Sequence, residues 1–406
     1  MSKITIVCTP AYGHVLPMLG PIAELVRRGH DVVVCNSAQF ETLTTATGAR
    51  SVTYPPALDM MDIASALKTG NHLNVYPLLL EAVPPLTDFM LDSLEKDRPD
   101  VVVYDAVAMW GAMAARIHGI PRVSDSPIFV FEVFRHMVSW QELWGLTTGF
   151  LPQLPRVVMA YLRMLRFGLG NMPIAIPLYP VRGHKDLLLT SRELHPASPI
   201  FRKDNWVFTG ASIDARTRPD QFDFSKLDGR PVIFISMGTL QFVNDRVFKT
   251  CLETFADYPA QFLLAAGPGS DVNRFGAIPD NFIVQQTFPQ MPLLEKTALF
   301  ITHGGLGSVH ETLWQGVPFV AIPQQFEQMR NALAAARGGA GVILDDEVYG
   351  RPIKGDELRR AVDKVLADPG YRENARRLGD TLRAPGGYVK VADVIEEVAA
   401  APVTGR

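Results

Sequence analysis

The sequence predicts an α/β protein with two doubly wound domains, each built on a parallel sheet covered by helices. Three observations indicate this fold class. The chain has 406 residues, which at about 150 residues per domain suggests two or three domains. Short runs of β-branched and aliphatic residues alternate with helical stretches in both halves, as in buried parallel strands joined by helices. A polar stretch without periodicity, residues 209–230, separates the halves.

The first half begins with strand, helix and strand, and the alternation returns after residue 100. The helix Leu19–Arg27 ends before Gly29, and a later helix spans Ala106–Ile117. The strands expected here are Ile4–Thr9, Asp31–Asn36 and Val101–Tyr104. We therefore expect one parallel sheet in this half, with helices on both faces.

The stretch Met137–Pro180 interrupts this alternation. It is rich in tryptophan, phenylalanine and methionine, with scattered proline and glycine. Two interpretations stay open. These residues form helices that pack on the surface, or they form an irregular apolar wall for a hydrophobic ligand, because such pockets are lined by aromatic and methionine side chains.

Strands and helices alternate again in the second half, and the chain closes with a helix over Val389–Ala400. The expected strands are Val232–Ser236, Gln261–Ala266, Ile283–Gln285, Leu299–Thr302 and Phe319–Ile322. The expected organisation is an N-terminal domain at 1–210, a linker at 211–230, a C-terminal domain at 231–385 and a terminal helical segment at 386–406. Ligands bind outside the carboxyl ends of the strands in such sheets, so we expect a site in a central cleft that both domains face.

Composition narrows the function classes. The net charge of −3 disfavours a nucleic-acid or anionic-membrane surface, and no apolar run is long enough to span a bilayer. No secretory signal precedes the first strand, and three widely spaced cysteines suggest free thiols in a reducing compartment, so a cytoplasmic location is expected. A nicotinamide-dependent dehydrogenase is disfavoured because G-x-G-x-x-G is absent and Asn36, rather than an acidic residue, closes the second strand.

Residues 300–328 are the most informative stretch for function. A buried strand runs into His303-Gly304-Gly305, and a helix opens near Ser308. Glycines and a small hydroxyl at a helix N-terminus leave backbone N–H groups and the helix dipole available to phosphate, and His303 can donate a further hydrogen bond. Glu327-Gln328, one strand–helix unit later, suits the hydroxyl groups of a sugar, although both residues could equally cap a helix starting near Met329. The stretch predicts a nucleotide-sugar site.

The same stretch resembles the donor-binding signature of glycosyltransferase family 1, whose members have the GT-B fold and include bacterial macrolide-type enzymes. The matched elements, in order, are Pro289-Gln290, His303-Gly304-Gly305, Ser308, Glu311, Gly316-Val317-Pro318 and Glu327-Gln328. The resemblance implies an acceptor-binding N-terminal domain, a nucleotide-sugar-binding C-terminal domain and a last helix that docks back on the N-terminal domain. Inverting transfer without a metal is implied as well, and the sequence contains no Asp-x-Asp for Mn or Mg.

A catalytic base is expected in the first strand–helix loop, Thr9 to His14, after which Pro17 is expected to begin the helix. A histidine suits removal of a proton from an acceptor hydroxyl at neutral pH. His14 alone could instead be a packing or capping residue, but its Gly-His-x-x-Pro context matches the family's catalytic histidine. A carboxylate on the other ring nitrogen would fix the tautomer. Asp105, after the strand Val101–Tyr104, is the candidate by resemblance, its alternative is the N-cap of the next helix, and Asp125 is a weaker rival.

The resemblance also assigns the donor site. Ser236, Gly238 and Thr239 would face the β-phosphate, and Glu311 would reach the ribose, unless it is a solvent-facing helical residue. Thr287 replaces a base-stacking tryptophan found in many members, so base recognition would rest on backbone groups at Phe288 and on Gln290. The full set of expected donor-binding residues is Ser236, Gly238, Thr239, Phe288, Gln290, His303, Gly305, Leu306, Gly307, Ser308, Glu311, Glu327 and Gln328.

The expected function is transfer of a hexose from a nucleotide sugar, with UDP-glucose ahead of a TDP-sugar, to a hydroxyl of an apolar natural product such as a macrolide or polyphenol. No bound cofactor or metal is expected, and the chain is expected to be a monomer or weak homodimer. Two alternatives remain: a TDP-deoxysugar-dependent antibiotic glycosyltransferase, and a non-catalytic auxiliary protein that binds a nucleotide sugar. The auxiliary protein would not need both His14 and Asp105.

Overall fold

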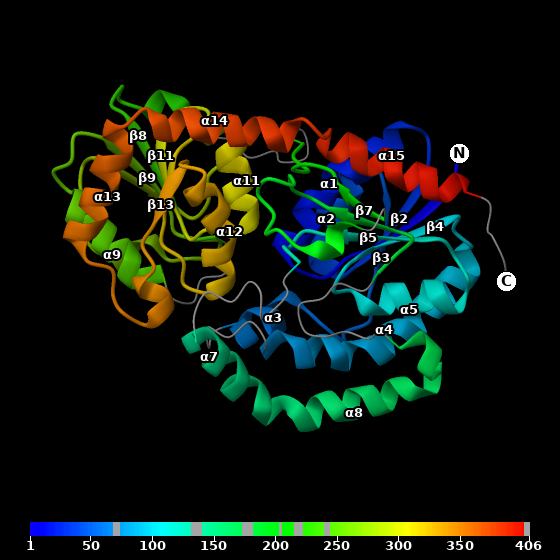
Figure 1. The fold of residues 1–406 in the computed structure, drawn as a ribbon. Coiled ribbons are helices and arrows are strands. Elements are labelled where there is room, and N and C mark those ends of the chain that lie inside the picture. The colour runs from blue at the N-terminus through cyan, green and yellow to red at the C-terminus, as the bar shows by residue number, and fades with distance from the viewer. Residues whose placement is uncertain are drawn as a thin grey trace. The chain divides into compact units, whose positions relative to one another are not determined.

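The computed structural model describes residues 1–67, 74–130, 140–172, 182–202, 205–214, 222–238 and 244–401. The chain divides into two compact units, one formed by Met1–Thr217 with Ala384–Arg406 and the other by Arg218–Arg383. Each unit is an α/β structure with one parallel sheet (Figure 1). In the described part of the chain, no helix has an uncharged apolar stretch long enough to cross a bilayer.

The sheet of unit 1 has seven parallel strands in the order β3-β2-β1-β4-β5-β6-β7. Its strands are β1 (Lys3–Val7), β2 (Asp31–Asn36), β3 (Arg50–Thr53), β4 (Val101–Asp105), β5 (Arg122–Ser126), β6 (Lys185–Leu188) and β7 (Trp206–Phe208). The order reverses direction between β1 and β4, which is the topological switch point where doubly wound sheets bind ligands. Strand alternation sends Ile4 and Ile6 to one face and Val7 to the other.

Helices cover both faces of this sheet. The helices of unit 1 are α1 (Tyr12–Arg27), α2 (Glu41–Thr45), α3 (Met60–Leu67), α4 (Val75–Asp97), α5 (Met109–Ile117), α7 (Trp140–Phe150), α8 (Leu154–Met164) and α15 (Gly387–Ala400). Apolar residues of α1 and α15 share one core with β1, β2 and β4. Residues of α4, α5 and α8 form the core on the opposite face.

The start of α1 differs from the sequence expectation. The helix begins at Tyr12 with Ala11 as its N-cap, so Pro17 and Pro21 lie inside it. Proline lacks the N–H that would donate to the carbonyl four residues earlier, so Pro21 leaves the Pro17 carbonyl without its helical partner. The Ser212 hydroxyl donates a hydrogen bond to that carbonyl oxygen. A hydroxyl nearly two hundred residues away in the sequence therefore supplies the hydrogen-bond donor that Pro21 lacks.

The described part of the aromatic-rich stretch 137–180 is helical; residues 137–139 and 173–180 lie outside the described residues. One face of α8 packs on α4 through the buried residues Val157, Ala160 and Met164. The side chains of Trp140 and Trp144 on α7 are exposed. The described residues of this stretch therefore form helices on the surface, which is the first of the two interpretations.

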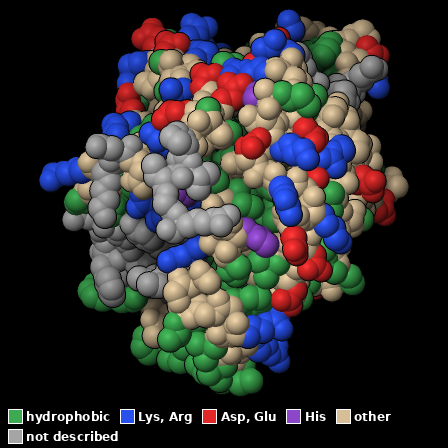
Figure 2. Space-filling view, turned by 90° about the vertical axis from the view of Figure 1, so that its right-hand side faces the viewer, with side chains coloured by type: hydrophobic (Ala, Val, Ile, Leu, Met, Phe, Trp, Pro, Cys, Tyr) green, Lys and Arg blue, Asp and Glu red, His purple; other side chains and the backbone are tan. Residues whose placement is uncertain are grey.

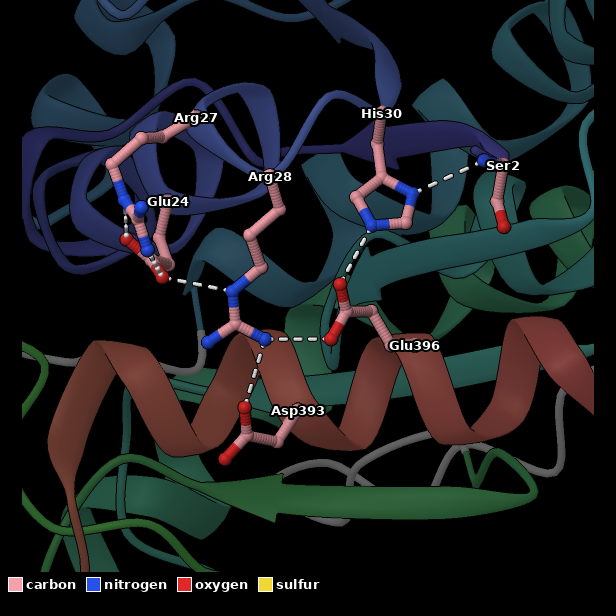
Figure 3. Close-up of polar contacts among 7 residues, drawn as sticks. All are labelled: Ser2, Glu24, Arg27, Arg28, His30, Asp393 and Glu396. Atoms are coloured by element: carbon pink, nitrogen blue, oxygen red, sulfur yellow. Dashed lines mark hydrogen bonds and ion pairs between the residues drawn. The ribbon is translucent and has the colours of Figure 1, made fainter.

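The terminal helix α15 belongs to unit 1 and packs on α1. Figure 3 shows the polar contacts that join the two helices. Arg28 donates to Asp393 Oδ1 at 2.8 Å and to Glu396 Oε2 at 2.6 Å, and His30 Nε2 lies 2.6 Å from Glu396 Oε1. The Ser2 N–H donates to His30 Nδ1, which leaves the proton on Nε2 for Glu396. Partial burial opposes ionisation of Glu396, but the bonds from His30 and Arg28 outweigh it and lower its pKa.

The sheet of unit 2 has six parallel strands in the order β10-β9-β8-β11-β12-β13. Its strands are β8 (Val232–Ser236), β9 (Gln261–Ala265), β10 (Phe282–Gln285), β11 (Thr297–Thr302), β12 (Phe319–Ala321) and β13 (Gly341–Ile343). Its helices are α9 (Asn244–Phe255), α10 (Gln290–Leu294), α11 (Leu306–Trp314), α12 (Phe326–Arg337), α13 (Gly355–Ala367) and α14 (Gly370–Arg383). The switch point lies between β8 and β11, where Phe234 and Phe300 are register partners with stacked rings.

Candidate active site

The switch point of unit 1 brings His14 and Asp105 together. The strands β1 and β4 pair in parallel, with Val7 opposite Tyr104, so the residues that follow them leave the sheet at the same edge. Asp105 is the last residue of β4. His14 lies in the first turn of α1, because that helix starts before the expected position. Residues 91 positions apart in the chain therefore meet at one point.

The two side chains form a direct contact. His14 Nδ1 lies 2.5 Å from Asp105 Oδ2, and Asp105 is almost fully buried whereas one-fifth of the His14 side chain is exposed. The second carboxylate oxygen, Oδ1, accepts a hydrogen bond from the Val107 N–H at 2.9 Å. The helix after β4 begins at Met109 with Ala108 as its N-cap, not at Ala106 as expected. Asp105 is thus not the N-cap. Its Oδ2 orients the His14 ring, and its Oδ1 holds the turn that follows β4.

This arrangement sets the chemistry of the imidazole. A carboxylate accepts but cannot donate, so Asp105 favours the tautomer with the proton on Nδ1. The lone pair then resides on Nε2, the nitrogen that can accept a proton from another molecule. A histidine with a buried carboxylate on one nitrogen has the geometry of a general base with an orienting acid.

Asp125 lies next to this pair but has a different environment. It stands opposite Asp105 in the register of β4 and β5, and it is buried. Its Oδ2 has no hydrogen-bond partner among the described residues, whereas Asp105 contacts the His14 ring. Burial, followed by the negative charge of Asp105, raises the pKa of Asp125 well above its usual range. Asp125 is therefore a buried neighbour of the pair.

A buried hydrogen-bond chain behind the pair was not anticipated from the sequence. The Tyr54 hydroxyl donates to the Cys8 carbonyl at 3.0 Å, and Trp110 Nε1 donates to the Tyr54 hydroxyl at 3.1 Å. This chain holds Cys8 in the segment between β1 and α1, and that segment leads into the first turn of α1 with His14. No local pattern signals it, because its members are separated by 46 and 56 residues.

In unit 2, Ser236 and His303 meet at the switch point. Ser236 ends β8, and His303 follows β11, whose Thr302 is the register partner of Ser236. Gly238 has φ +83°, and a Cβ there would come within 2.8 Å of the His303 ring. A Cβ on Gly305 would overlap His303 Nε2. Both glycines are therefore required for the ring to occupy its position. Thr239, which was expected to contact the phosphate with Ser236 and Gly238, lies outside the described residues.

The electrostatics of His303 favour a neutral ring. Burial lowers the pKa of His303 to about 4, opposed by a hydrogen bond involving the Ser236 backbone. At neutral pH the imidazole is uncharged, so it can donate one hydrogen bond without the desolvation cost of a buried cation. Its Nδ1 is buried and has no hydrogen-bond partner among the described residues.

The N-terminus of α11 adjoins this histidine. Gly305 is the N-cap, and no side chain among the described residues caps the helix. Leu306, Gly307 and Ser308 form the first turn, so the helix starts two residues before Ser308, near which it was expected to open. Uncapped amides at a helix N-terminus, together with the helix dipole, favour an anion.

Gln290 and Glu311 are joined by a direct hydrogen bond, which the sequence did not predict. Gln290 Nε2 donates to Glu311 Oε2 at 2.6 Å, and Glu311 is buried. Glu311 is therefore not a solvent-facing helical residue. Phe288 is buried beside Phe234, with ring centroids 6.0 Å apart, whereas Thr287 is exposed.

Glu327 and Gln328 lie in the first turn of α12, which starts at Phe326 rather than near Met329. Gln328 Oε1 accepts a hydrogen bond from the N–H of Gln324, the residue before the N-cap Gln325, at 2.9 Å, and no side chain among the described residues caps the helix. Glu327 accepts a hydrogen bond from Asn331. Both side chains are partly exposed after β12, next to the strand that leads to His303. Among the described residues, no three His, Cys, Asp or Glu side chains gather as a metal site.

The solved structures identify the class of this architecture. The crystal structure of the glycosyltransferase of kitacinnamycin matches with a TM-score of 0.81 and 30% sequence identity, covering 98% of this chain and 99% of that one. Two parallel-sheet α/β domains of this kind define the GT-B class of glycosyltransferases.

Sequence comparisons agree with that class. Residues 251–398 match the family model described as "Erythromycin biosynthesis protein CIII-like, C-terminal domain". Demethyllactenocin mycarosyltransferase of Streptomyces fradiae is 28% identical over 98% of this chain and 86% of its own. The uncharacterized UDP-glucosyltransferase YojK of Bacillus subtilis (strain 168) is 27% identical over 98% of this chain and 97% of its own. The chain belongs to the macrolide-type branch of glycosyltransferase family 1. It is therefore a hexosyltransferase that uses a nucleotide-sugar donor and a small-molecule acceptor.

Proposed function

We propose that this enzyme transfers glucose from UDP-glucose, with inversion and without a metal, to a hydroxyl of an apolar natural product such as a macrolide or polyphenol. The observation that carries the catalytic part of the proposal is the 2.5 Å contact between His14 Nδ1 and the buried Asp105. Unit 1 would receive the acceptor and supply the base. Unit 2 would hold the donor.

The base step follows from the tautomer. The lone pair on His14 Nε2 takes the proton of the acceptor hydroxyl while that oxygen attacks the anomeric carbon. The bond between the anomeric carbon and the diphosphate oxygen breaks as the new C–O bond forms on the opposite face, so the configuration inverts. Asp105 stabilises the imidazolium that results, because its carboxylate lies against the protonated Nδ1.

The leaving nucleoside diphosphate needs compensation for its developing charge. We propose that the N-terminal amides of α11, the residues Ser236, Gly238 and Thr239, and His303 provide it. The uncapped helix N-terminus supports this role, because fixed amide dipoles stabilise charge without reorganisation. The neutral His303 would contribute its single N–H rather than a positive charge, and that N–H would donate to the diphosphate in place of the Ser236 backbone.

The remaining donor contacts are proposed from position. Glu311 would reach the ribose, and Gln290 with the Phe288 backbone would contact the base. The hydrogen bond between Gln290 and Glu311 supports a common role in binding the nucleoside, because it holds the two side chains next to each other. Glu327 and Gln328 would bind the sugar hydroxyls. Gln328 Oε1 already accepts from the Gln324 N–H, so its sugar contact would come from the amide nitrogen, which that bond does not use.

The relatives support two donors. One is named a UDP-glucosyltransferase and the other a mycarosyltransferase, at nearly equal identity to this chain. A TDP-deoxysugar donor is therefore the second candidate. Thr287 stands where many family members have a base-stacking tryptophan, so the choice between uracil and thymine must be measured.

The decisive experiment is a donor panel. Thermal shifts with UDP-glucose, TDP-glucose and GDP-glucose identify the base, and product formation on macrolide and polyphenol acceptors follows with the best donor. We expect UDP-glucose to give the largest shift and a β-glucoside product from the α-linked donor. Retention of the α configuration would overturn the inverting mechanism. A rate abolished by EDTA and restored by Mn or Mg would overturn metal independence.

A further inference from the structure

An apolar stripe on the outer side of α8 has no role in the site described above. The helical run consists of η3 (Leu151–Gln153), α8 and η4 (Leu165–Phe167), which follow one another without a break. One face of the run packs on α4. A second apolar stripe points away from that core and consists of Leu151, Leu154, Val158, Leu162 and Leu165, each 40–55% exposed. The lower end of the space-filling view, where Figure 1 places α8, is largely hydrophobic (Figure 2).

The spacing of this outer stripe is that of a helix–helix seam. Its members are separated by three, four, four and three residues, so they stay within a narrow band along the helix. The pattern reads the same in both directions about Val158: Leu151 and Leu165 are equidistant from it, as are Leu154 and Leu162. An antiparallel copy of the helix would therefore present the same pattern. A two-fold interface requires this self-complementarity.

Charges favour a second protein surface over an anionic lipid surface. Arg156 donates to Glu81 of α4 at 2.6 and 2.8 Å, and Arg166 forms an ion pair with Asp88 of α4. These two arginines are thus neutralised within the chain and lie off the stripe. Binding to anionic lipid draws on a polar face rich in uncommitted Lys and Arg.

The exposed area suits a weak homodimer. The five side chains of the outer stripe and the exposed Leu169 beyond them present apolar surface on the order of 600 Å². Two copies would bury at most roughly 1,200 Å², the lower end of the range for specific interfaces. The same area left bare is at the upper end of what monomeric proteins expose, about 300–600 Å².

We propose that this enzyme forms a two-fold symmetric homodimer through the outer stripe of α8, with Val158 on the symmetry axis and the two helices antiparallel. Each Leu154 then packs beside the partner's Leu162, and each Leu151 beside the partner's Leu165. Helix axes at such seams are about 8–10 Å apart, which places facing Cα atoms within about 4–6 Å. That separation permits a disulfide between two cysteines on the axis.

Sedimentation velocity over a concentration series provides the first test. We expect a reversible monomer–dimer equilibrium, and Val158→Arg should raise the dissociation constant at least tenfold, because two cations would face each other across the axis. Met159→Arg is the matched control. That side chain is also exposed, but it lies one residue, about 100°, around the helix, and it should leave the equilibrium unchanged. A wild-type protein that stays monomeric throughout, or equal loss in both variants, overturns the proposal.

Disulfide trapping tests the axis itself. All three native cysteines, Cys8, Cys35 and Cys251, are buried, so the wild-type protein gives no background. Val158→Cys should oxidise to a covalent dimer, whereas Met159→Cys should remain monomeric under the same oxidant. Trapping of Met159→Cys in preference to Val158→Cys contradicts the predicted register. Co-sedimentation of a monomeric protein with anionic phosphatidylserine vesicles, lost in Val158→Arg, would assign the stripe to lipid and overturn the dimer.

Discussion

Replacing Asp105 with asparagine tests the proposed dyad with almost no change of shape. The Val107 N–H donates to Asp105 Oδ1, so the side-chain oxygen of asparagine should stay at that position and its NH₂ group should turn to His14. The ring nitrogen that faces it must then accept. The imidazole proton is forced to Nε2, and the lone pair needed for the acceptor proton is lost. The rest of the site keeps its geometry.

The size of the effect follows from this tautomer change. An aspartate-to-asparagine change in a serine protease triad lowers kcat by about 10⁴-fold for the same reason. General-base catalysis contributes about 10²–10⁴-fold, so we expect kcat to fall within that range, equal to about 3–5 kcal/mol in activation free energy. Donor affinity should remain close to the wild-type value, because the donor residues proposed above lie in unit 2.

Initial rates with a saturating donor, the dissociation constant for the nucleotide and the melting temperature should be measured together. His14→Ala should lower kcat to a similar extent, and the double variant should be no slower than the slower single variant, because the two residues act as a unit. A kcat of Asp105→Asn above one-tenth of the wild-type value would refute the reasoning. A large fall in melting temperature with an unaltered rate per folded molecule would show that Asp105 is structural.

Three further predictions concern packing and charge. Gly305→Ala should weaken nucleotide binding at least tenfold in calorimetric titrations, with a circular dichroism spectrum like that of wild type, because its Cβ displaces the His303 ring. Asp125→Asn should become progressively more stable than wild type as the pH rises above about 4, because the raised pKa of Asp125 means that ionisation of this buried carboxyl destabilises the fold. The melting temperatures of both proteins should be compared over this pH range, and a difference that shrinks with rising pH would contradict the prediction. Glu396→Gln should lower the free energy of unfolding of unit 1 by about 1–2 kcal/mol in urea at pH 7. This difference should vanish as the pH falls through the lowered pKa of Glu396, because the wild-type carboxyl is then protonated as well. An equal difference at low pH would show a packing defect.

Sequence patterns located β1, β2, β4 and the strands β8 to β12, but they did not predict β3, β5, β6, β7 or β13. The strands β2 and β8 have the expected bounds, because a continuous β-branched run bounded by polar residues is a local signal. The motif residues at the ends of β1, β4, β8 and β11 could be placed at sheet edges, because parallel strands share the edge at which they end. The family could be recognised because the motif residues and their order resemble its donor-binding signature.

Helix starts needed the tertiary structure. The sequence placed the start of α1 at Pro17 because proline is favoured in the first turn, but the helix begins at Tyr12. The Ser212 hydroxyl satisfies the carbonyl that Pro21 leaves open, and no local rule anticipates a partner from another part of the chain. The same applies to α5, where Asp105 uses its two oxygens for different neighbours.

Sequence by itself determined the fold class, the glycosyltransferase family and the residue types at the carboxyl ends of the strands, because these depend on local periodicity and on motif order. The family resemblance had predicted that His14 pairs with Asp105, and the tertiary structure decided the geometry of that contact and which other side chains meet. The pairing of β1 with β4 brings His14 to Asp105 and leaves Asp125 as a buried neighbour, and the packing of α10 beside α11 joins Gln290 to Glu311. The physical reason is that a hydrogen bond depends on distance and direction between atoms. Parallel strands and packed helices set these across long sequence separations that no local pattern records.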